Sequence, residues 1–174
     1  MSPSNGPLTL TTACGASIPP FTEDFDSWGG VIPVCWSGIK TDLSGFGWTW
    51  DGMGTGSFGT GPLTGNSGDY YLYLETSGSP LITVEYAYLP IFDLSTIPNA
   101  VVEFAYHKYG IAMGDLTVEV SSDNINWNTL FTLSGQQQSN QSDPYLDAVV
   151  DLTGYTSATT YIRFGGSYGG YGGY

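Results

Sequence analysis

The sequence is poor in positive charge. Its lysines and arginines are only Lys40, Lys108 and Arg163, against 16 acidic residues, so the formal net charge is −13. Because phosphate backbones bind clustered basic side chains, we expect no nucleic-acid partner and no direct insertion into an anionic membrane. Divalent cations are natural partners of such a charge, although an acidic excess also keeps a secreted protein soluble.

Long apolar runs and helical periodicity are missing as well. No stretch approaches the roughly 20 apolar residues of a membrane-spanning helix, and the first seven residues lack the basic and apolar regions of a signal peptide. Apolar residues do not repeat at helical spacing over three turns, whereas turn signals recur about every 8 to 12 residues. This pattern favours an all-β fold, a sandwich of two antiparallel sheets.

Cysteine is scarce, with only Cys14 and Cys35 in the chain. In an oxidising compartment, a disulfide closing this loop would stabilise the fold by about 3 kcal/mol in the chain-entropy model. The alternative is a pair of buried thiols. Because the composition is typical of extracellular proteins, we favour the disulfide and expect a secreted or cell-surface location.

The length of 174 residues fits one domain preceded by an arm. Residues 1–20 are rich in Pro, Ser, Thr and Gly and form the expected N-terminal arm, with a strand-like run at 8–12. Residues 21–174 form the expected domain. Besides the central region described next, we expect strands at 70–75, 84–90, 127–133, 145–152 and 160–164, with a hairpin loop at 121–126.

Strand signals are densest in residues 101–120. Apolar residues alternate with others through 101–106 and again through 116–120, which is the period of half-buried strands. Gly110 and Gly114 bracket a Tyr-Gly corner between the two runs. We therefore expect two strands that form a hairpin-like pair at the centre of the protein.

Two groups of residues are candidate binding sites. Glu23, Asp24 and Asp26 crowd three carboxylates into four positions, which either attracts a cation such as calcium or leaves a hydrated acidic edge. Asp51 is a further candidate ligand by its chemistry. Aromatic side chains could stack on sugar rings or form a protein-binding hot spot, and we expect about half of them to lie in the core. They are Trp48, Trp50, Phe58, Tyr70 and Tyr88.

Catalytic patterns are weak, and we expect no enzyme. His107 is the only histidine, so we expect it to be a structural hydrogen-bonding residue. Ser167 matches Gly-x-Ser-x-Gly, but no helix can follow it in a Tyr/Gly-rich segment. The acidic residues on expected strands are interpreted as outward-facing rather than as a glycosidase pair. They are Glu75, Glu85, Glu103 and Glu119.

An ordered set of short matches runs through most of the chain. It comprises Phe25-Asp26, Cys35-Trp36, residues 59–64, 71–78, 104–110 and 113–116, Trp127, Thr129-Leu130, residues 150–152 and Ile162-Arg163-Phe164. In this order, the set resembles the MAM module, named for meprin, the A5 protein and receptor phosphatase mu, over residues 20–170. The opening 20–26 also looks like the start of repeats in secreted bacterial adhesins.

The resemblance implies a jelly-roll β-sandwich related to concanavalin-like lectins. It also implies extracellular adhesion or association, often with calcium bound. Asp26 matches the acidic residue of the family that follows Phe, and Asn66 lies near the acidic position after the Gly-Pro turn.

The sequence departs from the MAM pattern in three ways. It lacks the second cysteine pair of the family, one member of which lies near the position of Val101. It ends in the Tyr/Gly-rich segment 165–174, where the family continues into an Asp-Ile-Ala-Ile-Asp-Asp strand. A domain without that strand would have a sheet edge open for self-association or for another chain, and would lack carboxylates of a metal site. A shortened sequence would have the same ending.

We therefore expect a non-catalytic extracellular module, of a bacterial surface protein, that binds a protein partner or a surface glycan. The alternatives are a carbohydrate-binding module of a secreted enzyme and a structural subunit of a surface filament.

Overall fold

The computed structural model describes residues 14–42, 45–52, 54, 56–76 and 84–170. Within these ranges the chain forms eight strands and one short 3-10 helix, Asp26–Trp28, and no α-helix. All strand pairs are antiparallel, and the prediction of an all-β sandwich is confirmed. The strands are β1 Gly47–Asp51, β2 Tyr71–Glu75, β3 Val84–Tyr88, β4 Val101–Tyr106, β5 Met113–Ser121, β6 Asn128–Ser134, β7 Leu146–Asp151 and β8 Tyr161–Tyr168.

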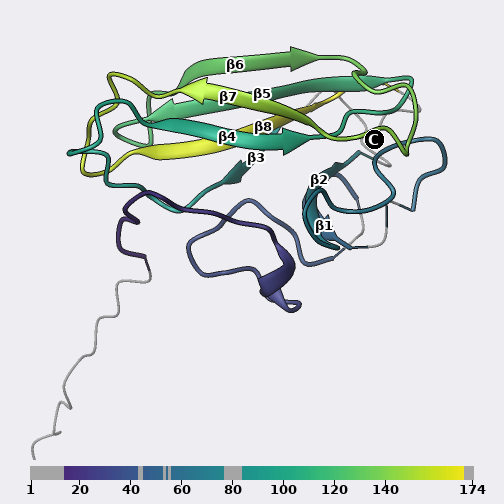
Figure 1. Cartoon of the computed structure of the whole chain (residues 1–174), viewed down its shortest axis with the longest axis horizontal. Coiled ribbons are helices and arrows are strands. Elements are labelled where there is room, and N and C mark those ends of the chain that lie inside the picture. The colour runs from purple at the N-terminus through teal and green to yellow at the C-terminus, as the bar shows by residue number, and fades with distance from the viewer. Residues whose placement is uncertain (1–13, 43–44, 53, 55, 77–83, 171–174) are drawn as a thin grey trace, which may run out of the picture.

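Two layers make up the body of the molecule (Figure 1). One layer is a four-stranded sheet of order β3-β8-β5-β6, and the other is the pair β4-β7. Aromatic rings join the layers, since the Phe104 ring of β4 lies 5.6 Å from Phe131 of β6 and 5.0 Å from Phe164 of β8. The side chains that alternate toward this interface form the core, as expected of stacked sheets.

A third, two-stranded sheet, β1-β2, continues the larger sheet beyond β3. Ser37 bridges to Tyr88 of β3, and Ile39 bridges to Trp48 of β1, so residues 37–39 connect the two sheets. In Figure 1, β1 and β2 lie at the end of the body below β4. Around the molecule, the strands therefore run from β2 through β1, β3, β8, β5 and β6 to β7 and β4.

The core is densest where β5 and β8 meet the β4-β7 layer. Val118 and Val120 of β5 are completely buried, and Ile162 of β8 lies against them. Leu94, from the loop after β3, and Leu152, just after β7, close the same cluster. The alternation of apolar residues in β5 thus reflects which face packs into the core, while Glu119 on the other face is buried by polar partners.

The expected hairpin of residues 101–120 is wrong, although both strands exist. β4 pairs with β7, and β5 pairs with β6 and β8, so the two strands lie in opposite layers. The connection between them is fixed by Lys108, whose Nζ donates to the carbonyls of Gly114 (2.7 Å) and Leu133 (2.6 Å). Alternation predicts strands but not their partners, because it reports only which face is buried.

The last strand is longer than expected. β8 continues from Phe164 through two glycines to Tyr168. Those glycines allow close packing, since a Cβ at Gly165 would lie against Oγ1 of Thr117, and a Cβ at Gly166 would lie 2.7 Å from Cδ2 of Leu74. The Gly-rich segment therefore begins as part of the sheet, beyond the strand predicted at 160–164.

The expected disulfide is confirmed, joining Cys14 to Cys35 with their Cα atoms 5.4 Å apart. Just beyond it, the backbone of Ser17 exchanges hydrogen bonds with Ile91 and Asp93, which ties this part of the arm to the domain. The strand-like run at 8–12 lies outside the described residues. In the described part of the chain, no helix is long and apolar enough to cross a membrane.

Candidate functional site

A groove of about 910 Å³ separates β4 from β2. Its walls are mainly apolar and come from both strands, from residues 19–25 and from the ends of β5 and β8. It reaches from the core at Leu94, which is 1% exposed, to exposed residues such as Asp24 and Asp115. The groove is therefore an opening from the hydrophobic core to the surface.

One edge of β4 faces this groove. The amide of Leu152 donates to the carbonyl of Ala100 (2.9 Å), directly before the β4-β7 ladder. Because hydrogen-bonded and non-hydrogen-bonded pairs alternate in an antiparallel ladder, the backbone groups of Val101, Glu103 and Ala105 point away from β7. No described strand pairs with β4 on that side. The edge carries three outward N–H and C=O pairs.

The apolar side chains of β4 beside this edge are only partly buried, although they face the opposite layer of the sandwich. Val102, Phe104 and Tyr106 lie on the β4 face that points toward the opposite layer, yet each is only partly buried. Leu72 and Leu74 of β2 are partly buried in the same groove. Apolar side chains on both sides of the groove thus lack neighbours that would remove them from water.

Charge around the groove is mainly negative. Four carboxylates line it, those of Glu23, Asp24, Glu103 and Asp115. The only lysine in the lining is Lys108, which is buried and donates to two backbone carbonyls. Burial lowers the pKa of Lys108 to about 8, while Asp115 opposes this shift. The rim therefore presents carboxylates to an incoming molecule.

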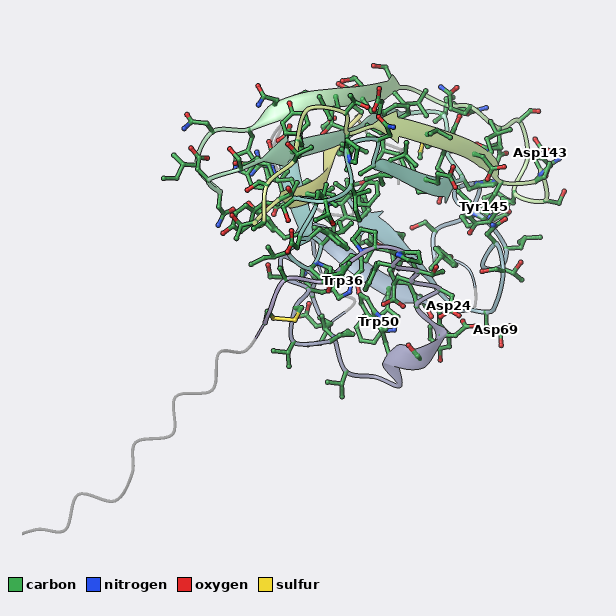
Figure 2. All side chains as sticks on the ribbon, turned by 60° about the vertical axis from the view of Figure 1, so that its left-hand side comes forward. Asp24, Trp36, Trp50, Asp69, Asp143 and Tyr145 are labelled. Atoms are coloured by element: carbon green, nitrogen blue, oxygen red, sulfur yellow. A yellow bond between two sulfur atoms is a disulfide. The ribbon has the colours of Figure 1, made fainter. Side chains whose placement is uncertain are left out.

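The carboxylate of Asp26 accepts hydrogen bonds from the loop before β2 rather than lying free in solvent. Its Oδ1 accepts from the backbone amides of Asp69 (3.1 Å) and Tyr70 (2.9 Å). Its other oxygen lies against Gly68, where any side chain would overlap with it. Figure 2 shows Asp24 and Asp69 close together at this corner. One carboxylate thus connects the 3-10 helix to the loop before β2.

The other predicted metal ligands bind backbone amides or lie elsewhere. Oε1 of Glu23 accepts from Phe25 N (2.8 Å), and Oδ1 of Asp24 accepts from Asp26 N (3.1 Å). Asp51 accepts from Gly52 N at the end of β1 (2.6 Å), and Asn66 is exposed on the groove rim. Within the described ranges, no three His, Cys, Asp or Glu side chains form a group that could hold a metal ion. The calcium site stays a prediction.

The predicted binding aromatics fall into different environments. Trp48 is 6% exposed, and its Nε1 donates to the Glu85 carbonyl (2.9 Å), so it is part of the groove wall. Trp50 packs on Trp28, in a cluster with Trp36 and Phe25. Figure 2 shows Trp36 and Trp50 near the disulfide.

Two of the predicted aromatics are exposed. Phe58 is fully exposed, and Tyr70 is 42% exposed at the rim of the groove, over Gly52. Of these four residues, only Trp48 and Tyr70 belong to the groove.

His107 lies at the β4 end of the groove, against the ring of Tyr145 (5.5 Å). Burial lowers the pKa of His107, while the backbone of Asn140 and the carboxylate of Asp143 oppose the shift. Figure 2 shows Tyr145 and Asp143 on neighbouring parts of this end. The imidazole is therefore biased toward its neutral form and adds no positive charge to the groove at neutral pH.

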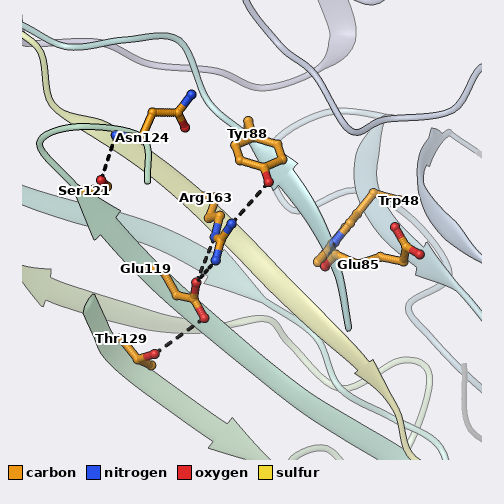
Figure 3. A network of polar contacts seen from close by, with 8 residues as sticks. All are labelled: Trp48, Glu85, Tyr88, Glu119, Ser121, Asn124, Thr129 and Arg163. Carbon is orange, nitrogen blue, oxygen red and sulfur yellow. Dashed lines mark hydrogen bonds and ion pairs between the residues drawn. The ribbon is translucent and has the colours of Figure 1, made fainter. Parts of the chain in front are cut away.

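A second polar centre lies on the outer face of the four-stranded sheet (Figure 3). Arg163 of β8 is stacked between the rings of Tyr86 (3.6 Å) and Trp127 (3.9 Å). Its Nε donates to Oε2 of Glu119 (2.8 Å), and its Nη1 donates to the hydroxyl of Tyr88 (3.1 Å). Stacking on two rings and an ion pair occupy the guanidinium fully, so this cluster stabilises the sheet.

The sequence predicts that Glu119 is an outward-facing acid on a strand. It does lie on the outer face, but it is 8% exposed because Arg163 and Thr129 cover it. The sequence predicts an open sheet edge only where a strand is missing at its end, and nothing in it predicts the groove beside β4. No protein-family model matches the chain.

Proposed function

We propose that this protein is a non-catalytic, extracellular binding module of the MAM type, which associates with a protein partner. The observation that carries the proposal is the groove of about 910 Å³, with apolar walls and a carboxylate rim. Concave, mainly apolar sites with a few polar groups at the rim are typical of binding surfaces. The disulfide is compatible with an extracellular location.

A bead-adhesion assay tests this function. Beads that carry the protein should adhere to surfaces coated with its partner proteins, and Leu72→Lys should abolish adhesion because it places a charge on the groove wall. Ile125→Lys is the matched control, since Ile125 is 79% exposed in the β5–β6 turn, outside the groove lining. Equal adhesion by wild type and Leu72→Lys would contradict the proposal. Consistent binding to one polysaccharide on a glycan array would favour the carbohydrate-binding alternative.

Calcium is proposed as a stabiliser bound near the acidic residues Glu23, Asp24 and Asp26, a proposal that rests on the sequence. Backbone amides already occupy Oδ1 of Asp24 and of Asp26, so carbonyls and water would complete any coordination shell. Millimolar calcium should raise the melting temperature, and Asp24→Asn should reduce the rise. Asp123→Asn is the control, because that carboxylate lies in the β5–β6 turn and accepts from Ile125 N and Asn126 N. An unchanged melting temperature at millimolar calcium would exclude the site.

A further inference from the structure

The edge of β4 and the groove beside it also define the form of the partner, an inference that rests on the proposed binding function. We propose that the groove takes an extended peptide segment of a partner protein, in which apolar residues alternate with basic ones. This segment adds to β4 as a new strand, between β4 and β2.

The backbone of β4 supplies the first part of the argument. Val101, Glu103 and Ala105 direct their N–H and C=O groups away from β7, toward the groove. An exposed row of such groups is a template for another strand, because main-chain hydrogen bonds form with any sequence. β4 has six residues, which sets the length of segment that can pair along it.

The groove walls supply the second part. A strand beside β4 would alternate its side chains between the groove and the outer face. Its inward side chains would meet Phe104 and Leu116 on one side and Leu72 and Leu74 on the other, all partly buried. Apolar residues at every second position would therefore complete the core at this end.

The rim supplies the third part, because it decides the remaining positions. Glu23, Asp24, Glu103 and Asp115 line the groove, and the amine of Lys108 is already bound by two carbonyls. Basic side chains on a bound segment would lie near these carboxylates, whereas acidic ones would be repelled. A second copy of this chain, with its net charge of −13, is a poor donor for the same reason.

A binding experiment on the full chain tests the proposal. The probe is the peptide Lys-Val-Thr-Val-Lys-Val-Thr with blocked ends. One comparison peptide has the same composition with its valines consecutive, and another has Glu in place of Lys. The first peptide should bind at least about tenfold more tightly than either comparison, and its affinity should fall as salt is raised. Equal binding of all three peptides, or no binding by the first, would overturn the proposal.

Two proline variants locate the binding edge. Ala105→Pro removes an N–H that points toward the groove and should weaken peptide binding by about tenfold, since a backbone hydrogen bond is lost and the edge is blocked. Val149→Pro makes the same change on β7, at a position that pairs with Glu103 and points away from β4. It should leave binding unchanged. The reverse pattern would place the peptide on the other edge.

A third measurement does not depend on the folding of a variant. Peptides that are N-methylated at odd or at even positions lose the donors of one edge only. One of the two sets should abolish binding, and the amides of Val101, Glu103 and Ala105 should become protected from hydrogen exchange when the unmodified peptide is added. Binding that survives both methylation patterns would overturn strand addition. Protection of these amides without peptide, together with dimers in ultracentrifugation, would identify a second copy as the occupant and overturn the partner proposal.

Failure of this inference is distinguishable from failure of the proposed function. Adhesion that is lost in Leu72→Lys but unaffected by Ala105→Pro would keep the binding module and overturn strand addition.

Discussion

Strands β5 and β4 share an alternating apolar pattern but have different surroundings. β5 lies between β8 and β6, and its Val118 and Val120 are completely buried. β4 is paired only with β7 among the described strands, and its inward Phe104 is partly buried although it contacts two other phenylalanine rings. Val118 and Val120 are thus covered by a strand on each side, whereas Phe104 lines the groove on the side where β4 has no described neighbour.

The two regions also differ in how their charged side chains are paired. On the β5–β8 side, Arg163 and Glu119 are covered by aromatic rings and by each other. Around the β4 groove, carboxylates line the rim without arginine or histidine cations beside them at neutral pH. The ion pair of Arg163 and Glu119 therefore stabilises the fold, whereas the groove carboxylates of Asp24, Glu103 and Asp115 are exposed to solvent.

The largest effect is expected from the ion pair of the four-stranded sheet. Glu119→Ala should lower the free energy of unfolding by about 4 kcal/mol, because it leaves the charge of Arg163 buried without its partner. The two side chains are 11% and 12% exposed. Asp42→Ala removes the partner of Lys40 at a site where the Asp42 side chain is 67% exposed, and should cost less than about 1 kcal/mol. Urea unfolding measures both, and equal losses would contradict the structural role of Glu119.

Two leucine-to-alanine variants compare the stability cost of losing a side chain in the core with that of losing one in the groove. Leu94→Ala in the core should cost about 3 kcal/mol, because it leaves a cavity. Leu72→Ala in the groove should cost about 1 kcal/mol, since water already reaches that side chain and no closed cavity forms. Chemical denaturation gives both values. A Leu72→Ala cost as large as that of Leu94→Ala would mean that the groove is filled in solution.

The smallest expected effect is a pH dependence of the free energy of unfolding, caused by His107 at the end of the groove. Burial holds the pKa of His107 below its ordinary value of 6.5, so the unfolded chain binds this proton more readily than the folded one. Stability should therefore fall as pH drops through 6.5, and the fall should be smaller in His107→Gln. As His107 is the only histidine in the chain, its imidazole signal gives the folded pKa by NMR. A folded pKa above 6.5 would reverse the predicted slope.

Much of the fold could be predicted from local pattern. Alternation located β4, β5 and β7 to within a few residues, and the polar turn at 121–126 identified the β5–β6 hairpin. In that turn, Asp123 accepts from Ile125 N (2.8 Å) and Asn126 N (2.7 Å), which holds the pKa of its carboxyl well below its usual value. The hydrogen bonds of such a turn join residues that are adjacent in the sequence. The turn can therefore be predicted from the sequence alone.

Pairing across the sandwich could not be predicted in the same way. The partners of β4 and β5 are set by packing between distant residues, such as Phe104 with Phe131 and Phe164. The same limit applies to Glu23, Asp24 and Asp26. The sequence shows that their carboxylates are close together, but it does not show which backbone amides they accept hydrogen bonds from. Asp26 accepts from the backbone amides of Asp69 and Tyr70, and the residues adjacent to Asp26 in the sequence do not predict that contact.

The position of β8 has a consequence for how the chain folds. β8 is the last of the described strands, yet it lies between β3 and β5 in the four-stranded sheet. Neither neighbour can complete its ladder until β8 has left the ribosome, so this sheet assembles only after residues 161–168 have been synthesised. Pairing of strands so far apart along the chain also makes folding slow relative to helical domains of this size.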